Sequence, residues 1–246
     1  MTAESLTVAS TARPDPVSIE QVHSPARGTP VDLVTIRPAN AASARLPVCL
    51  ALHGRSANAK VFLDLGVPEA LNAVTAAGAK PFAVVSVDGG DSYWVAKTPS
   101  DDPQKMLTDD LPAWLVNRGF ATTPFAVLGI SMGAYGALNY ARNPGLNAVA
   151  AISGALFESW PEARSRNAFS NEAEWEATEP LRHVDAIKAD RLGVWCGESD
   201  PFVNQARRLI DLAHPRVSDI SAGGHTDTYW RRILPDVLRF VADALP

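Results

Sequence analysis

Short, continuous apolar runs recur along the chain and are separated by segments in which apolar residues have helical spacing. Runs of this length, bounded by Gly, Pro and polar residues, are typical of strands whose two faces are both covered. We therefore expect a series of buried strands. The runs lie at residues 48–52, 82–87, 125–129, 148–153 and 192–196.

Helical spacing appears between these runs, at residues 106–118, 132–142 and 205–213. The last helix is the clearest, because one apolar stripe continues from Trp230 through Ile233, Leu234, Val237, Leu238, Val241 and Leu245. Strands that alternate with helices in this way form parallel sheets with right-handed crossovers. The pattern predicts an α/β fold: a mostly parallel central sheet with helices on both faces.

The remaining segments have other patterns. Residues 31–37 alternate apolar and polar side chains, which predicts a half-exposed strand near a sheet edge. Residues 1–16 are rich in Ser, Thr, Ala and Pro without periodicity, so we expect a flexible N-terminal tail. Residues 17–246 fit a single domain of this class. Within it, residues 157–188 form an irregular stretch, which we expect to be a cap-like insertion.

Charge and composition exclude some classes of partner. The chain has 22 Lys and Arg against 27 Asp and Glu, a net charge of -5, without a long run of either sign. This argues against nucleic acid as a partner. We expect no membrane span, because no apolar stretch reaches the required length, and a cytoplasmic location, because the first twenty residues lack an export signal. Oligomeric state is not indicated.

Two cysteines, Cys49 and Cys196, lie inside predicted buried strands. Neither has the spacing of a metal-binding or redox motif. We expect two buried free thiols on strands that are not neighbours. No other motif indicates a metal ion or an organic cofactor.

The most informative motif follows the apolar run at 125–129. The sequence Gly129-Ile130-Ser131-Met132-Gly133 leads directly into a helical segment, which is the context of a nucleophile elbow, Gly-x-Ser-x-Gly. There the serine occupies a strained turn, and side chains at the two glycine positions would collide with the neighbouring strand and helix. We expect Ser131 to be a catalytic nucleophile, and the strand before and helix after it favour this over a purely structural turn.

A serine hydroxyl needs a base to remove its proton. Among the five histidines, His225 is best placed, because it follows a predicted strand at 217–221 and two glycines, and it precedes the last helix. It should emerge at the carboxyl ends of the strands, where open parallel sheets bind ligands. His23 and His214 lie in surface-like contexts, and His183 belongs to the insertion.

The base in turn needs a carboxylate that orients it. Asp200 lies in the loop after the run at 192–196 and completes the chain order Ser, Asp, His. Glu198 in the same loop is the competing candidate. Asp200 is favoured because it is further from the strand and precedes Pro201. Asp227 is too near His225 in sequence to approach its ring easily.

Two backbone amides are candidates for an oxyanion hole. The amide of Met132 lies at the positive end of the helix that follows the elbow. The amide of Arg55 lies in the loop after residues 48–52, where Gly54 allows a tight turn. His53 is expected to support this loop by hydrogen bonding. Candidates for contact with substrate are His53, Trp94, Tyr229 and Trp230, with Tyr93 as a further aromatic near the cleft.

Several segments together resemble the esterase D family of α/β-hydrolases, which includes S-formylglutathione hydrolases and the related secreted mycolyltransferases. The likeness spans most of the chain after the tail. It lies in VHSPARGTPVDLVTIRP, VVSVDGGDSYW, LPAWLVNRGFATTPFAVLGISMGAYGALNYA and AGGHTDTYWRRILPDVLRFVADAL. The resemblance implies the α/β-hydrolase fold and a triad of Ser131, Asp200 and His225, in agreement with the motif analysis.

The predicted function is hydrolysis of a small carboxylic ester through an acyl-Ser131 intermediate, without cofactor. Two alternatives stay open. Transfer of the acyl group to a sugar or lipid hydroxyl uses the same triad and differs in the acceptor. A catalytically silent hydrolase fold that serves as a binding module would not need an intact triad, whereas a suitable residue is present here at every position.

Overall fold

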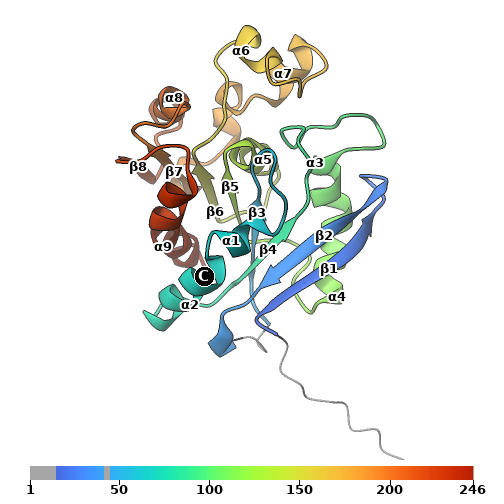
Figure 1. Cartoon of the computed structure of the whole chain (residues 1–246), viewed down its shortest axis with the longest axis vertical. Helices are drawn as coiled ribbons and strands as arrows, with labels where there is room; N and C mark the ends of the chain where they lie inside the picture. Colours follow the sequence, from blue (N-terminus) through green and yellow to red (C-terminus); the bar gives the residue numbers. More distant parts are fainter. Residues whose placement is uncertain (1–14, 42–44, 246) are drawn as a thin grey trace, which may run out of the picture.

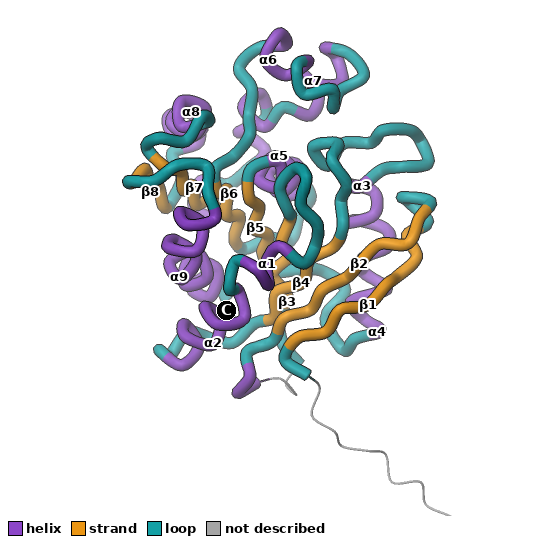
Figure 2. The backbone as a smooth tube through the Cα atoms, viewed as in Figure 1, coloured by secondary structure: helices purple, strands orange, loops and turns teal. Residues whose placement is uncertain are grey.

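The computed structural model describes residues 15–41 and 45–245, so most of the predicted tail lies outside the described residues. An eight-stranded sheet runs through the molecule, with helices on both faces (Figures 1 and 2). The strand order is β1-β2-β4-β3-β5-β6-β7-β8. The strands are β1 (Val17–Ser24), β2 (Thr29–Ile36), β3 (Val48–Leu52), β4 (Ala83–Val87), β5 (Ala126–Ile130), β6 (Ala148–Ile152), β7 (Leu192–Gly197) and β8 (Val217–Ser221).

The sheet is mixed but mostly parallel. β1 pairs antiparallel with β2, and β2 antiparallel with β4. All other neighbours, from β4 through β3 to β8, are parallel. The α/β class and the predicted sheet are therefore confirmed, and each apolar run forms a strand to within one residue at either end.

One strand differs from its prediction. The alternating pattern at 31–37 indicated a half-exposed strand, but β2 is almost wholly buried from Val31 to Ile36. β1 takes the edge position, and β2 lies inside the sheet with both faces covered: Val31 and Leu33 pack into one core and Val34 and Ile36 into the other. The hydroxyl of Thr35 is enclosed as a result, without a hydrogen-bond partner.

Two layers of helices cover the sheet. Leu50 of β3 packs into one core with α4, α5 and α8, whereas its neighbour Cys49 packs into the other with α1, α2 and α9. Successive side chains of a strand point to opposite faces, so one apolar run supplies both cores. The helices are α1 (Val61–Asp64), α2 (Val67–Ala76), α4 (Leu111–Asn117), α5 (Met132–Tyr140), α8 (Val203–Ala213) and α9 (Asp227–Asp243).

The helix predicted at 106–118 consists of three consecutive pieces. A short helix α3 (Pro103–Lys105) continues into a π-helical turn η2 (Met106–Asp110) and then into α4. Pro112 lies at the start of α4 and has no N–H to donate to the preceding turn, which accounts for a change of helix type there.

The irregular stretch at 157–188 lies beyond α5, at the upper end of the molecule in Figure 1. Its helical turns are α6 (Trp160–Arg164), α7 (Glu172–Thr178), η3 (Pro180–Arg182) and η4 (Val184–Ala186), and η5 (Ala189–Arg191) leads into β7. The buried carboxylate of Glu179 ties it together by accepting hydrogen bonds from Trp175 Nε1, at 3.0 Å, and from the Phe157 and Leu181 amides. One 3-10 turn, η1 (Ala39–Ala41), follows β2.

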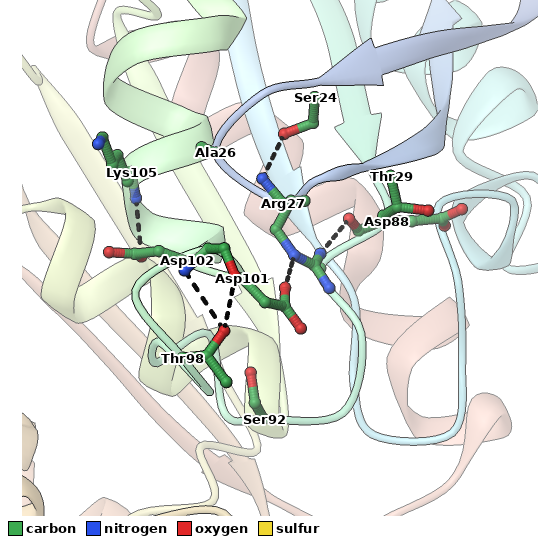
Figure 3. A network of polar contacts seen from close by, with 12 residues as sticks. Ser24, Ala26, Arg27, Thr29, Asp88, Ser92, Thr98, Asp101, Asp102 and Lys105 are labelled. Atoms are coloured by element: carbon green, nitrogen blue, oxygen red, sulfur yellow. Dashed lines mark hydrogen bonds and ion pairs between the residues drawn. The ribbon is translucent and has the colours of Figure 1, made fainter.

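The β1–β2 hairpin is fastened to the rest of the molecule by Arg27 (Figure 3). Its guanidinium forms an ion pair with Asp101 and donates to the Asp88 carbonyl at 3.0 Å. Its amide donates to Ser24 Oγ at 3.0 Å, and the Ser24 hydroxyl donates to Asp110 at 2.6 Å. The tip of the hairpin is therefore joined to the segments after β4 and before α4.

Cys49 and Cys196 are buried free thiols on β3 and β7, which are not neighbours, as expected. Within residues 15–41 and 45–245, no helix is long and apolar enough to cross a membrane.

Candidate active site

Ser131 lies in a sharp turn between β5 and α5. Its backbone is left-handed, with φ 57° and ψ -118°, and its N–H donates to the Ile152 carbonyl at 2.9 Å. A Cβ at Gly129 would lie 2.1 Å from the Gly133 carbonyl oxygen, and one at Gly133 would lie 1.9 Å from that of Leu52. Both glycines are therefore required by close backbone contacts, one with the helix and one with β3, as the motif analysis predicted.

The imidazole of His225 lies against the Ser131 hydroxyl. His225 Nε2 is 2.9 Å from Ser131 Oγ, although 94 residues separate the two along the chain. Two aromatic side chains hold the imidazole edge-on, Trp230 at 5.1 Å and Phe202 at 5.5 Å between ring centroids. The ring is partly exposed, so a substrate can reach it.

Asp200 lies on the other side of this imidazole. Its Oδ2 is 2.9 Å from His225 Nδ1, and its Oδ1 accepts the Phe202 amide at 2.8 Å. Burial alone would raise the pKa of Asp200, but the hydrogen bonds from His225 and the Phe202 amide outweigh it and hold the pKa below its ordinary value. The competing Glu198 is exposed, and so is Asp227.

The loops that carry Asp200 and His225 are joined by their backbones. The Glu198 amide donates to the Ser221 carbonyl, and the Ser199 amide to the Gly223 carbonyl, each at 2.8 Å. A Cβ at Gly197 would come within 2.4 Å of that same Gly223 oxygen. This close approach fixes the distance between the loop of Asp200 and the loop of His225.

The loop after β3 lies beside Ser131. A Cβ at Gly54 would be 3.4 Å from Ser131 Cβ, so the next amide, that of Arg55, lies close to the serine. Two carboxylates hold the loop: Asp91 accepts the Ser56 amide and Asp88 the Ala59 amide, both at 2.6 Å.

Two backbone amides near Ser131, those of Arg55 and Met132, are free to bind an oxyanion. The Arg55 amide makes no hydrogen bond within the part of the chain that the structure describes. The Met132 amide begins α5, where no acceptor exists inside the helix.

Three of the four predicted substrate contacts lie beneath the site instead of in it. His53, Trp94 and Tyr229 are at most 2% exposed. The aromatic side chains are enclosed because glycines leave room for them: Trp94 packs on Gly89 and Gly136, and Tyr229 packs on Gly223. Tyr93, at 3% exposed, is enclosed by other aromatic rings, those of Tyr135, Phe157 and Phe169.

His53 has the supporting role that was expected of it. Its Nε2 accepts the Gly89 amide at 2.9 Å, its Nδ1 lies 2.8 Å from the Gly54 carbonyl, and its own carbonyl accepts Trp94 Nε1 at 3.2 Å. Burial lowers the pKa of His53, so the ring is neutral and its Nε2 is available as an acceptor.

A cavity of about 250 Å³ opens beside Ser131 and His225. Of the four predicted contacts, only Trp230 lines it. No residue of 157–188 does. One wall is apolar, and the charged residues Arg55 and Asp227 complete the lining. The apolar wall consists of Ala57, Val61, Leu65, Ile130 and Trp230.

Sequence analysis did not single out Ser153, whose Oγ accepts a hydrogen bond from Trp230 Nε1 at 3.0 Å. Its only signal was its place directly after a buried strand, at the carboxyl edge where functional residues gather. In the described part of the chain, no three His, Cys, Asp or Glu side chains gather in a way that could hold a metal ion.

Comparison with known proteins identifies the family of this chain. A model of the Esterase family, described as "Putative esterase", matches residues 24–241. No curated protein matches the sequence.

Three solved structures have closely similar folds. A ferulic acid esterase has a TM-score of 0.76 at 19% identity, covering 93% of this chain and 98% of its own. An S-formylglutathione hydrolase from Agrobacterium tumefaciens has 0.76 at 16%, covering 94% and 95%. MPT51 of Mycobacterium tuberculosis has 0.75 at 19%, covering 95% and 100%. The fold is therefore that of the α/β-hydrolases.

Proposed function

Because this chain belongs to the Esterase family, we propose that it is a serine esterase that hydrolyses carboxylic esters through an acyl-Ser131 intermediate. The observation that carries the proposal is the position of His225, whose two ring nitrogens each lie 2.9 Å from an oxygen, one of Ser131 and one of Asp200. A base between a nucleophile and an orienting carboxylate is the arrangement that activates a serine hydroxyl.

The reaction proceeds in two halves. Ser131 Oγ attacks the ester carbonyl while His225 Nε2 takes its proton, and Asp200 stabilises the imidazolium that forms. The imidazolium then protonates the departing alcohol, which leaves acyl-Ser131. In the second half, His225 takes a proton from water, the hydroxide oxygen adds to the acyl carbonyl, and the proton returns to Ser131 Oγ as the carboxylic acid departs.

The charge that develops on the carbonyl oxygen is stabilised by the Met132 and Arg55 amides. Met132 lies at the first position of α5, so the partial positive charge of the helix terminus adds to its hydrogen bond. Arg55 follows Gly54, which lies against Ser131. Preorganised amides of this kind stabilise the tetrahedral intermediate without further rearrangement.

The apolar cavity beside Ser131 receives the acyl group. Its volume, about 250 Å³, is below the roughly 300–1,000 Å³ typical of sites for drug-sized ligands. We therefore expect short or compact acyl groups to react faster than long chains.

Labelling with a fluorophosphonate probe tests the proposal. Wild type should incorporate one probe on the peptide that contains Ser131 and should hydrolyse p-nitrophenyl acetate. Ser131→Ala should do neither, whereas Ser165→Ala, which removes an exposed serine hydroxyl from the insertion, should behave as wild type. Label on another residue, or absence of both label and turnover in wild type, would overturn the proposal and favour a binding module. Ester products formed with added alcohols would indicate acyl transfer instead.

A further inference from the structure

Arg166, in the 157–188 stretch, is a cation whose hydrogen-bond donors are unused. Its Nε is enclosed and has no hydrogen-bond partner, and no carboxylate of the described residues lies within ion-pair distance of its guanidinium. The residue as a whole is partly exposed, and its two terminal nitrogens are not enclosed. An enclosed charged donor without an acceptor is rare, because it has lost hydration without compensation.

Two aromatic rings hold this guanidinium. The Arg166 Cζ lies 5.4 Å from the ring centroid of Phe202 and 5.5 Å from that of Phe157. A guanidinium is attracted to the faces of aromatic rings and is weakly hydrated, so it is suited to such a place. The rings position the cation but leave its charge unneutralised.

The same rings are fixed relative to the catalytic groups. The Phe202 amide donates to Asp200 Oδ1 at 2.8 Å, and the Phe202 ring lies edge-on to the His225 imidazole at 5.5 Å. One aromatic ring therefore separates the guanidinium from the imidazole. The backbone at Arg166 is held as well, because its amide donates to the Ala163 carbonyl at 3.0 Å.

Four carboxylates of the 157–188 stretch have partners other than Arg166. Glu162 accepts the Glu158 amide, Glu174 accepts the Ser170 amide, Glu176 pairs with Arg182, and Glu179 accepts Trp175 Nε1. The charge of Arg166 is therefore available to a ligand.

The position of Arg166 indicates which part of an ester it contacts. Trp230 and Phe202 both lie against the His225 imidazole, but only Trp230 lines the apolar cavity, and Arg166 does not line it either. In the proposed function this cavity holds the acyl group. The alcohol part, which His225 protonates as it departs, lies outside the cavity, and Arg166 is the unpaired cation found there beside the imidazole.

We propose that Arg166 determines specificity: its guanidinium, held on the Phe157 and Phe202 rings, binds an oxyanion carried by the alcohol part of the ester. This inference rests on the proposed function. The substrates are esters of a short acyl group with an alcohol that bears a carboxylate or a phosphate, since the planar guanidinium fork matches both groups. Hydrolysis releases the acid from the cavity and the anionic alcohol from the side of Arg166.

The charges in the cavity do not oppose an anionic substrate. Arg55 and Asp227 line it with one charge of each sign. Asp227 is the first residue of α9, where the positive end of a 17-residue helix offsets its charge.

The test compares acetate esters that differ in the charge of their alcohol part. p-Acetoxybenzoate is anionic, p-acetoxybenzamide is its neutral counterpart, and p-acetoxyphenyl phosphate and p-acetoxyphenyl trimethylammonium carry a phosphate and a cation. The measured quantity is the preference, kcat/KM for the benzoate divided by kcat/KM for the benzamide. Comparing this ratio between variants cancels the intrinsic reactivities of the esters.

Arg166→Gln and Arg166→Met both remove the charge. The preference should fall about 10-fold in each, the size of effect that a hydrogen bond to a charged group provides. The loss should arise chiefly from a higher KM for the benzoate, because the contact exists in the ground state and the transition state alike. Methionine still covers the two rings, so Arg166→Met carries the test if Arg166→Gln does not fold.

Two further variants separate the guanidinium from charge in general. Arg166→Lys keeps the charge without the planar fork and should retain only part of the preference. Arg164→Gln removes an exposed cation two residues away and should keep the wild-type preference. A faster reaction of the phosphate than of the benzoate in wild type, abolished in Arg166→Met, would identify phosphate as the preferred anion.

Three results would contradict the inference: an unchanged preference in folded Arg166→Met, an equal loss in Arg164→Gln, or a wild type that reacts fastest with the trimethylammonium ester. Each leaves the proposed function intact, provided that wild type is labelled by the fluorophosphonate at Ser131. Failure of that labelling removes the inference and the proposed function together.

Discussion

At the scale of single residues, two serines at the carboxyl edge of the sheet have left-handed backbones. Ser131 has φ 57° and Ser153 has φ 49°, and each directly follows a parallel strand. The two are joined, because the Ser131 amide donates to the carbonyl of Ile152, the residue before Ser153. β5 and β6 are adjacent strands, so their pairing in the sheet maintains both strained conformations. Both hydroxyls therefore stay at the same edge of the sheet.

Asp200 and Glu198 were competing candidates for the acid, and their environments now give different predictions. Asp200→Asn should lower kcat by about ten-thousand-fold, because an amide holds the imidazole in the wrong tautomer and cannot stabilise its charge. Glu198→Gln should leave kcat within about twofold, because Glu198 is exposed and surface changes away from the chemistry have small effects. Steady-state kinetics on one p-nitrophenyl ester compares them, and a large loss in Glu198→Gln would reverse the assignment.

Residues with a motif around them could be placed from sequence, and residues without one could not. Ser131 lies in a five-residue pattern, and His225 and Asp200 follow strands in a known order. Ser153 has no such pattern, because its partner Trp230 is 77 residues away and the contact exists only after folding. Trp94 and Tyr229 were misplaced because aromatic residues near a strand end look alike in sequence whether they line a cleft or fill the space beside a glycine.

At the scale of elements, prediction worked best for the short strands of the parallel part of the sheet. The runs at 48–52 and 217–221 match β3 and β8 at both ends, although β3 is buried throughout and β8 is only partly buried. The strand β1 and the short helix α1 had no specific prediction. β1 lies at the sheet edge with a largely exposed side-chain pattern, and α1 has only four residues. Neither segment has enough periodically spaced apolar residues for its secondary structure to be predicted.

α1 supplies part of the apolar cavity wall, so a change there should alter acyl-chain preference. Val61→Ala removes two methyl groups from the lining, and kcat/KM for a hexanoyl ester relative to an acetyl ester should rise about tenfold, within the range that a methylene or two provides. Leu63→Ala, on the same helix but outside the lining, is the control. An equal rise in both variants would mean that loosening of α1, and not cavity size, sets the preference.

The irregular stretch at 157–188 contains a buried titratable side chain, that of Glu179. Burial raises the pKa of Glu179 from its ordinary 4.5 to about 8, although three N–H donors oppose the shift. Between these values the folded state binds a proton that the unfolded state releases. The resulting stabilisation is fully present below about pH 4.5 and is lost as the pH rises through about 8.

Glu179→Gln should therefore flatten the dependence of the free energy of unfolding on pH between about 5 and 8. Glutamine stays neutral and keeps an acceptor for Trp175 Nε1 and the Phe157 amide. Urea titrations at several pH values measure the effect, and Glu176→Gln, an exposed carboxylate on α7, should retain the wild-type slope. An unaltered slope in Glu179→Gln would show that this carboxyl is ionised in the folded protein.

At the scale of the whole molecule, the site depends on strand order. Ser131, Ser153, Asp200 and His225 follow β5, β6, β7 and β8, which are four adjacent parallel strands. Alternation of strands and helices predicted a parallel sheet, but not this order, because a crossover can place the next strand on either side. The convergence of residues far apart in sequence is therefore a property of the sheet.

The β1–β2 hairpin lies at the other end of this sheet, so damage to its attachment should affect stability more than chemistry. Arg27 is the main fastening (Figure 3), and its side chain is 9% exposed. Arg27→Ala breaks the ion pair with Asp101, which is 30% exposed, and the bond to the Asp88 carbonyl. The free energy of unfolding should fall by about 1–3 kcal/mol, from the loss of a largely buried charged pair.

The same variant should keep kcat within about twofold of wild type. The substitution does not touch β5 to β8, the strands that position Ser131, Asp200 and His225. Glu20 lies in β1 of the same hairpin and forms a more exposed ion pair with Arg118, which follows α4. Glu20→Gln weakens this pair and should lower the free energy of unfolding by less than about 1 kcal/mol. Urea unfolding and ester hydrolysis on both variants separate the two effects. A large drop in kcat for folded Arg27→Ala would mean that the hairpin acts on the site through Asp88. The Asp88 side chain accepts the Ala59 amide and so holds the loop that carries the Arg55 amide.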